Sequence, residues 1–247
     1  MAHWIICVAA CACYQYIPAH ALEQALQKTT ETFTALTDSL KKQSTPSNTT
    51  TIADLRIPLN GCTIYIQDGN ITTIKADAIV NAANQSLMKH PAGVAGAIWN
   101  AAGADKINAA IEQGKKSKKI PESLEIGEVV VTDAFDLNAH GVKRILHTPG
   151  PNCTSGQDIN LLYACYQNCL LKADELMLTS IAFPAMSIGI FGCDRVKCAN
   201  LVAQALYNTT GRLKHVKDIY LLISTNLNDD NAKPYKYALV QALKQRL

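Results

Sequence analysis

The chain has 247 residues, of which 48% are hydrophobic and 17% are charged, so it is long enough and apolar enough to bury a sizeable core. Its formal net charge of +3 is too small for the dense basic face that follows nucleic-acid phosphates, and we expect no specific nucleic acid as a partner. We find no apolar run of the roughly 18 residues that a membrane span needs. The nine cysteines are too few for a disulfide scaffold in a chain of this length.

The first 21 residues have the features of a signal peptide. An apolar run from Trp4 to Tyr14 precedes Pro18 and the pattern Ala19-His20-Ala21, which is typical of a cleavage site. The region before the run lacks Lys and Arg, so a short buried helix is the alternative. If the signal functions, the protein is exported to the periplasm or secreted, and otherwise it is cytoplasmic. Cleavage after Ala21 would leave six of the nine cysteines.

Residues 22–51 predict a peripheral helix followed by a tether. Apolar side chains recur at roughly helical spacing from Leu22 to Leu40, and a polar stretch follows from Ser44 to Thr51. We therefore place the main globular domain at residues 52–247.

Beyond residue 52, apolar stretches of strand type alternate with stretches of helix type. In chain order we expect strands at 64–66 and 78–80, a helix at 94–102, strands at 129–131 and 145–147, a helix at 161–176, a strand at 180–183, a helix at 196–207, a strand at 219–223 and a helix at 234–246. This alternation predicts a three-layer α/β/α sandwich around a mostly parallel mixed sheet. In such sheets, ligands bind beyond the carboxyl ends of the strands.

Two of the expected strand ends are followed by small residues and glycine. The segment Asn81-Ala82-Ala83-Asn84 follows the strand at 78–80, and Gly93-Val94-Ala95-Gly96 then opens a helix. The segment from Pro184 to Gly192 follows the strand at 180–183 and again precedes a helix. Small residues let a ligand approach the backbone, and a helix N-terminus offers unpaired N–H groups to an anion. Two such loops predict a clamp for a diphosphate.

Five blocks of sequence, in this order, resemble a macro domain. They are Val80 to Asn84, Gly93 to Ile98, Gly127 to Thr132, Ile145 to Pro151 and Ile181 to Gly192, and the resemblance extends over about residues 52–230. It implies an α/β/α sandwich that binds ADP-ribose and removes mono-ADP-ribose from modified proteins or hydrolyses ADP-ribose esters. Lys89-His90 with Val94 to Ala97 is most similar to the viral-type hydrolytic members, because better-known cellular hydrolases carry Asp where this chain has Ala95.

The resemblance assigns roles to individual residues. Asn84 matches the amide that holds the distal ribose and helps to place the attacking water, and His90 matches a loop histidine near that ribose, so these two are the candidate catalytic residues. Without the resemblance, Asn84 is interpreted as a strand-end cap and His90 as a solvated residue. Phe191 is expected to pack against the distal ribose, the core or both, and Asn81 to brace the strand exit. The other expected ligand contacts are Asn70, Ile71, Gly93, Val94, Gly96, Ser187, Gly189, Ile190 and Gly192.

Three departures from the family pattern concern the adenine end and the first loop. Asn70 stands where the family usually has an Asp that accepts a hydrogen bond from the adenine amino group. We expect the side-chain oxygen of Asn70 to accept this bond still, but more weakly, since it carries no charge. Ser224 stands where the family often has an aromatic residue, and Pro91-Ala92-Gly93 replaces a run of three glycines. Together these changes predict ADP-ribose binding of micromolar affinity or weaker.

The other notable residues have structural interpretations. Cys165 and Cys169 lack nearby histidines, and His147 falls within an expected strand, so we expect buried side chains and neither a metal nor a cofactor. In an oxidising compartment any cysteine pair could form a bridge, but spacing does not specify the pairing. The lysines from Lys115 to Lys119 are expected to be solvated. We expect a monomer that is a hydrolase, with a non-catalytic ADP-ribose reader and an interaction protein with a degenerate pocket as alternatives.

Overall fold

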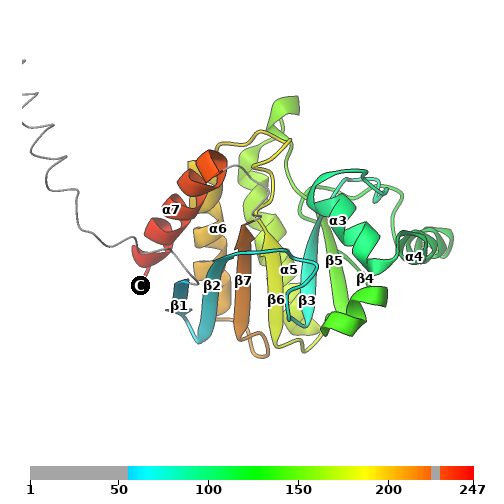
Figure 1. Ribbon diagram of the computed structural model, residues 1–247, viewed down its shortest axis with the longest axis horizontal. Coiled ribbons are helices and arrows are strands. Elements are labelled where there is room, and N and C mark those ends of the chain that lie inside the picture. Colours follow the sequence, from blue (N-terminus) through cyan, green and yellow to red (C-terminus); the bar gives the residue numbers. More distant parts are fainter. Residues whose placement is uncertain (1–54, 224–228) are drawn as a thin grey trace, which may run out of the picture. The chain divides into compact units, whose positions relative to one another are not determined.

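The computed structural model describes residues 55–223 and 229–247. Within these ranges the chain forms a seven-stranded mixed sheet with helices on both faces (Figure 1), which confirms the expected α/β/α sandwich. The expected signal peptide at 1–21, the expected helix and tether at 22–51, and Ser224 all lie outside the described residues.

The sheet has the strand order β1-β2-β7-β6-β3-β5-β4. The inner strands β2, β7, β6, β3 and β5 are parallel, and the edge strands β1 and β4 run antiparallel to their neighbours. The loops that follow β3 and β6 leave the same edge of the sheet from adjacent strands. The strands are β1 Leu55–Leu59, β2 Cys62–Asp68, β3 Ala78–Ala83, β4 Val130–Asp133, β5 Arg144–Pro149, β6 Ser180–Pro184 and β7 Asp218–Ile223.

Helices cover both faces of this sheet. One face carries α5 Leu162–Glu175, α6 Arg195–Thr210 and α7 Asp229–Lys244. The other carries α3 Gly93–Ala102, α4 Ala104–Lys116 and the 3-10 helix η1 Phe135–His140. Two further 3-10 helices, η2 Cys153–Ser155 and η3 Ile159–Leu161, lie between β5 and α5.

The sequence did not predict β1 or α4, for different physical reasons. β1 is a short edge strand that contains Pro58, a residue that cannot donate to a strand ladder. α4 is mostly polar and buries only Ile107 and Ile111 among its 13 residues, so few apolar side chains mark it as a helix of the fold. β1 is held by its pairing with β2, and α4 by the two isoleucines that it adds to the core.

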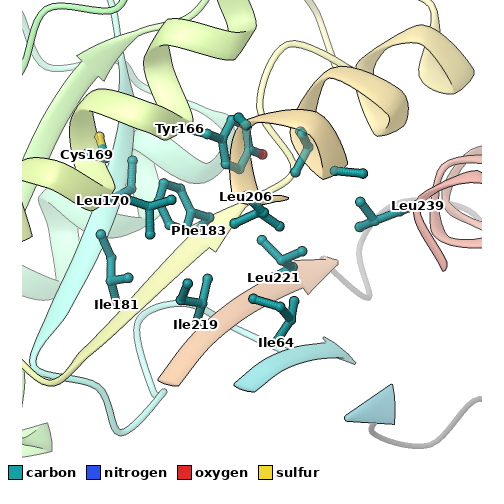
Figure 2. Packing of buried hydrophobic residues seen from close by; sticks show 14 of the residues in the cluster. Ile64, Tyr166, Cys169, Leu170, Ile181, Phe183, Leu206, Ile219, Leu221 and Leu239 are labelled. Carbon is teal, nitrogen blue, oxygen red and sulfur yellow. The ribbon is translucent and has the colours of Figure 1, made fainter. Parts of the chain in front are cut away.

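The core lies in two layers, one on each face of the sheet. Figure 2 shows the larger layer, in which strand residues such as Ile181 and Leu221 lie among residues of α5, α6 and α7. The ring of Tyr166 stacks on that of Phe183 with 4.7 Å between centroids. Its hydroxyl donates to the carbonyl of Pro184 at 3.0 Å, which anchors the carboxyl end of β6. The apolar stripe expected on α5 is buried and consists of Leu162, Cys165, Tyr166 and Cys169.

Candidate ligand-binding site

The first loop connects β3 to α3 and ends at a helix N-terminus that no side chain caps. Ala92 occupies the N-cap position, and no acidic residue lies in the first turn. The N–H of Gly96 donates to the carbonyl of Ala92 at 3.3 Å, whereas the N–H groups of Gly93–Ala95 find no acceptor among the described residues. By contrast, Asp194 caps α6 by accepting from the N–H of Lys197 at 2.8 Å. The start of α3 is therefore open to an anion.

Two glycines of this loop serve backbone geometry. Gly93 has a φ of +69°, in the left-handed region that favours glycine. A Cβ added at Gly96 would lie 2.8 Å from the carbonyl oxygen of His90 and 3.0 Å from that of Pro91. Gly96 is buried, so the structure gives it the role of letting α3 pack tightly against the loop.

Asn84 lies just beyond β3, where its half-buried side chain closes the start of the first loop. Its Nδ2 donates to the carbonyl of Met88 at 2.8 Å, and its Oδ1 accepts from the N–H of Met88 at 2.9 Å. The hydroxyl of Ser86 donates to the same Oδ1 at 3.0 Å. Both polar atoms of the amide thus organise the loop, and a ligand hydroxyl that reached Asn84 would compete with or extend these contacts.

His90 lies half-buried in the same loop, beside the N-cap of α3. Its Nδ1 is 2.9 Å from the carbonyl oxygen of Ala92 and 3.3 Å from the backbone nitrogen of Ala92. A protonated Nδ1 donates to the carbonyl, and an unprotonated one accepts from the N–H. In either form the ring is held by the loop backbone, and no described residue bonds to its Nε2.

One residue of the lysine cluster supports the first loop. The side chain of Lys115 is only 10% exposed, and its Nζ donates to the carbonyl of Ser86 at 3.0 Å. The expectation that this lysine is solvated is therefore wrong. Gln85 and Leu124 also exchange hydrogen bonds, from Leu124 N to Gln85 O at 2.8 Å and from Gln85 Nε2 to Leu124 O at 3.1 Å. The first loop is therefore hydrogen-bonded to the segment between α4 and β4.

The second loop runs from Ala185 to Cys193, between β6 and α6, and carries unpaired backbone donors. The N–H groups of Ile188–Phe191 donate to no acceptor in the described ranges. Gly189 is exposed, and a Cβ added there would meet nothing within 4 Å. The neighbouring Ile190 is 75% exposed. Consecutive donors beside open space can hold a phosphate group.

Ser187 stands at the base of the second loop in a strained conformation. Its φ of +65° is uncommon for a residue other than glycine. Its side chain is buried, with 8% of the residue exposed, and its Oγ has no hydrogen-bond partner within the described residues. A Cβ added at Gly150, directly after β5, would lie 2.6 Å from that oxygen. Strained backbone and unpartnered buried atoms concentrate at functional sites, which singles out this loop.

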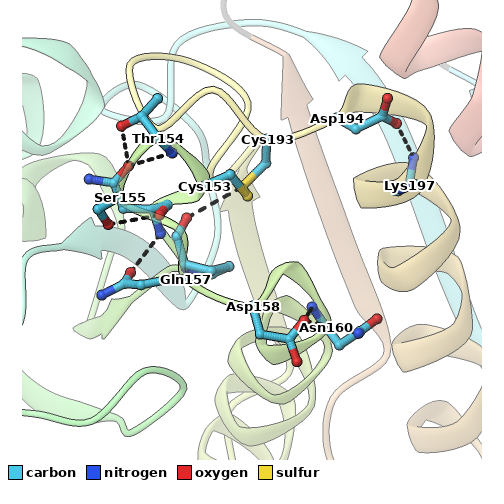
Figure 3. Close-up of a disulfide and its surroundings, with 11 residues drawn as sticks. Cys153, Thr154, Ser155, Gln157, Asp158, Asn160, Cys193, Asp194 and Lys197 are labelled. Carbon is cyan, nitrogen blue, oxygen red and sulfur yellow. Dashed lines mark hydrogen bonds between the residues drawn. A yellow bond between two sulfur atoms is a disulfide. The ribbon is translucent and has the colours of Figure 1, made fainter.

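A disulfide fastens the second loop to the loop after β5 (Figure 3). Cys153 and Cys193 are 40 residues apart in sequence, and their Cα atoms are 5.1 Å apart. The carbonyl of Phe191 accepts from the N–H groups of Cys153 at 3.0 Å and Thr154 at 3.2 Å. A Cβ at Gly192 would lie 2.8 Å from Cγ2 of Thr154, so the two loops pack closely. The disulfide therefore holds the backbone donors of the second loop in place.

Asn81 and His147 form part of a polar chain in the interior. Both residues have 0% exposure. Nδ2 of Asn81 lies 3.0 Å from Nδ1 of His147, whose Nε2 lies 2.9 Å from the hydroxyl of Thr132. Burial lowers the pKa of His147 to about 4, so the ring is neutral at pH 7. Asn81 then donates to Nδ1, and Nε2–H donates to Thr132, which links β3, β5 and β4 beneath the first loop.

Asn70 lies at the carboxyl end of β2, beside the end of β7. The N–H of Gly69 donates to the carbonyl of Ile223 at 3.0 Å. Oδ1 of Asn70 accepts from both the N–H and the hydroxyl of Thr72, at 3.0 and 2.9 Å. The oxygen that was expected to accept from a ligand is thus already used twice, whereas Nδ2 bonds to no described residue. Ile71 is 4% exposed and packs in the core.

The predicted site residues therefore divide into two groups. Those at the open carboxyl edge are Asn70, Asn84, His90, Gly93, Val94, Gly189, Ile190, Phe191 and Gly192. Those beneath it are Ile71, Asn81, Gly96 and Ser187. Sequence reasoning missed Lys115 and the disulfide, because neither carries a local pattern that shows which residue it meets in space.

The remaining cysteines of the described residues are buried thiols. Burial raises the pKa of Cys165 to about 12, so this thiol is protonated at neutral pH. Across the described ranges, no group of three or more His, Cys, Asp or Glu side chains is placed to hold a metal ion. Within the same ranges, we find no helix with the length and hydropathy of a membrane span. The four thiols are Cys62, Cys165, Cys169 and Cys198.

Comparisons with known proteins agree with this geometry. The family model described as Macro domain matches residues 80–202, which include both loops. An ADP-ribose glycohydrolase of Archaeoglobus fulgidus is 40% identical over 167 residues, which cover 65% of this chain and 85% of the relative. An O-acetyl-ADP-ribose deacetylase of Salmonella newport is 34% identical over 180 residues, which cover 72% of this chain and 94% of the relative. A solved variant of the Oceanobacillus iheyensis macrodomain with ADPR has a TM-score of 0.68 and 29% identity, covering 78% of this chain and 100% of the other.

Proposed function

The chain belongs to the macro domain family, and we propose on that premise that it binds ADP-ribose and hydrolyses the bond joining the distal ribose to a modified protein or an acyl group. The relatives named ADP-ribose glycohydrolase and O-acetyl-ADP-ribose deacetylase support a hydrolase, and the neighbour solved with ADPR supports the ligand. The observation that carries the proposal is the pair of loops that leave adjacent strands with unpaired N–H groups.

In this proposal the backbone binds the diphosphate. The N–H groups of Gly93–Ala95 point from the uncapped end of α3, where the helix dipole also favours negative charge. The N–H groups of Ile188–Phe191 supply the second set of donors. Because these donors are fixed by helix geometry and by the disulfide, the ligand pays little ordering cost at the phosphates.

The distal ribose then lies near Asn84, His90 and Phe191. Asn84 orients the ribose hydroxyls, Phe191 packs against the sugar, and His90 helps to position the first loop. Water adds at the anomeric carbon or the acyl carbon, and the bond to the protein side chain or to the ester oxygen breaks. Ala95 offers no carboxylate to act as general base, so the diphosphate of the ligand itself takes up the proton of the attacking water, and this proton then passes to the departing group.

The proposal includes a substrate and a compartment. We assign the substrate as a protein that carries mono-ADP-ribose, with ADP-ribose esters as the chemically related class. The Cys153–Cys193 disulfide supports an oxidising compartment, because such bridges persist outside the reducing cytosol. This agrees with the export signal expected at residues 1–21. The closer likeness to viral-type members stays a prediction.

Two measurements test the proposal. Calorimetry with ADP-ribose is expected to give micromolar affinity or weaker, and release of ADP-ribose from a mono-ADP-ribosylated protein is expected on adding the enzyme. Binding without release would favour a reader, an alternative supported by the engagement of both polar atoms of Asn84 within the loop. Absence of binding at millimolar ADP-ribose would favour an interaction protein with a degenerate pocket and would contradict the proposal.

A further inference from the structure

We propose that the base-binding end of this site presents a hydrogen-bond donor, Nδ2 of Asn70, and that the protein therefore accepts a 6-oxopurine at least as well as adenine. The inference rests on the proposed function, because it concerns the nucleobase of the same ligand. It differs from the sequence-based expectation, in which the oxygen of Asn70 accepts from the adenine amino group.

The orientation of the Asn70 amide is fixed by its partner. Thr72 presents a backbone N–H, which can only donate, 3.0 Å from one side-chain atom of Asn70. That atom must be the oxygen, and the hydroxyl of Thr72 donates to the same oxygen at 2.9 Å. A carbonyl oxygen has two lone pairs, and both are used. The exposed residue is left with an NH₂ group that bonds to no described residue.

The order of the strands places this NH₂ group where the nucleoside must lie. Gln85 of the first loop is hydrogen-bonded to Leu124, in the segment that leads to β4. A distal ribose at Asn84 therefore lies on the β3 and β5 side of the diphosphate. The second loop follows β6, the neighbour of β3 on the other side. A ligand that runs from Asn84 across both loops continues over the ends of β7 and β2, where Asn70 lies.

The chemistry of the purine edge then decides the preference. Adenine carries a 6-amino group, which donates and cannot bond to a second donor, so it offers Nδ2 only a ring nitrogen. Hypoxanthine carries a 6-oxo group, which accepts. An Asp at position 70 would keep the turn to Thr72 with one oxygen and present a charged acceptor with the other. The change from Asn to Asp therefore reverses the hydrogen-bonding character of one atom without removing the turn.

The test measures two ligands against two proteins by calorimetry. The ligands are ADP-ribose and inosine diphosphate ribose, its hypoxanthine analogue, and the proteins are the wild type and Asn70→Asp. We expect the wild type to bind the hypoxanthine ligand as tightly as ADP-ribose or more tightly. We expect Asn70→Asp to bind ADP-ribose about tenfold or more tightly than the hypoxanthine ligand. The carboxylate accepts a hydrogen bond from the 6-amino group of adenine, whereas it repels the 6-oxo group of hypoxanthine. Thermal unfolding checks that the variant folds.

Each result has one reading. Any wild-type preference for ADP-ribose beyond the error of the titrations would overturn the inference and leave the proposed function standing; one well-made hydrogen bond to the amino group would give a preference of about tenfold. Equal ratios in the wild type and Asn70→Asp would also overturn it, because position 70 would then not read the base. If neither ligand binds to either protein, both the proposed function and this inference are contradicted.

Discussion

The amino and carboxyl edges of the sheet use their hydrogen-bonding groups in opposite ways. At the amino edge, Asp174 accepts from the N–H groups of Lys214, His215 and Val216 at 3.0, 2.6 and 3.0 Å. Asp77 accepts from the N–H and hydroxyl of Thr179, each at 2.8 Å, and its other oxygen lies 2.8 Å from Nζ of Lys143. These carboxylates join loops and strands by accepting from the backbone N–H groups of Thr179 and of residues 214–216.

At the carboxyl edge the corresponding groups are left open. The start of α3 has no cap, and the N–H groups of Ile188–Phe191 have no acceptor within the described residues. The backbone there is held by the disulfide and by close packing at Gly96 and Gly192. A hollow of about 530 Å³ lies at the amino edge beside Asp77, but the carboxylate that lines it is already bonded. The proposed ligand site is therefore distinguished by an uncapped helix start beside a loop of consecutive N–H groups without acceptors in the described ranges, and not by hollow volume.

Removing the disulfide should have the largest effect on stability. The Cys153→Ser, Cys193→Ser double variant loses a cross-link that closes a 40-residue stretch, and such a bridge contributes about 2–4 kcal/mol. Chemical denaturation should show this loss, and calorimetry should show weaker ADP-ribose binding because the second loop is less ordered. A reducing agent should lower both the free energy of unfolding and the ADP-ribose affinity of the wild type. It should change neither quantity in the double variant. If binding survives in full, the disulfide does not organise the site.

Asn84→Ala should separate reaction from binding. The hydrolytic rate should fall by about a hundredfold or more, because the reacting sugar is no longer held in position. The free energy of ADP-ribose binding should become less favourable by only about 0.5–1.5 kcal/mol, since the diphosphate is held by other groups. Ser86→Ala is the matched control, as it removes one bond to Asn84 Oδ1 and keeps the amide. Full activity in Asn84→Ala would mean that another group, with His90 as the next candidate, places the water.

A pair of glycine substitutions separates folding from binding within the second loop. Gly192→Ala should destabilise the fold by about 1–3 kcal/mol, because its φ is +62° and the new Cβ would lie 2.8 Å from Thr154. Gly189→Val enters open space in the unliganded protein, so its stability should stay within about 0.5 kcal/mol. Its ADP-ribose binding should nevertheless be lost, because the side chain fills the ligand's space. Normal ADP-ribose binding by Gly189→Val would show that the diphosphate does not bind against this loop.

Asp77→Asn tests the amino edge and should have the smallest effect. We expect it to lower the free energy of unfolding by about 1 kcal/mol at pH 7. Burial alone raises the pKa of Asp77, but hydrogen bonds from Lys143 and Thr179 outweigh it and hold the pKa below its ordinary 3.8. The stabilisation is therefore present above that value and is lost as the pH falls through the lowered pKa of the folded protein. Denaturation from pH 7 to pH 2 should show a shallower acid loss in the variant. If Asp77→Asn changed the ADP-ribose affinity, the amino edge would also contribute to ligand binding.

The sequence predicted most of the fold because its strands and major helices carry strong local patterns. The apolar run at 78–80 and the stripe of α5 are of this kind. β1 and α4 were not predicted, because Pro58 is unfavourable within a strand and because α4 buries only two apolar side chains. The two loops of the site were found from their small residues. The pairing of Cys153 with Cys193 and the engagement of the Asn70 oxygen by Thr72 could not be predicted, because each depends on distances that spacing does not encode.

Amide hydrogen exchange with and without ADP-ribose shows whether the two loops hold the diphosphate. We expect the N–H groups of Gly93–Ala95 and Ile188–Phe191 to exchange quickly in the free protein and slowly in the complex, because the diphosphate becomes their acceptor. The N–H groups of residues 214–216, which already donate to Asp174, should exchange at the same rate in both states. If saturating ADP-ribose left both loops unprotected, or protected the residues around Asp77 instead, the diphosphate would not be bound by these loops.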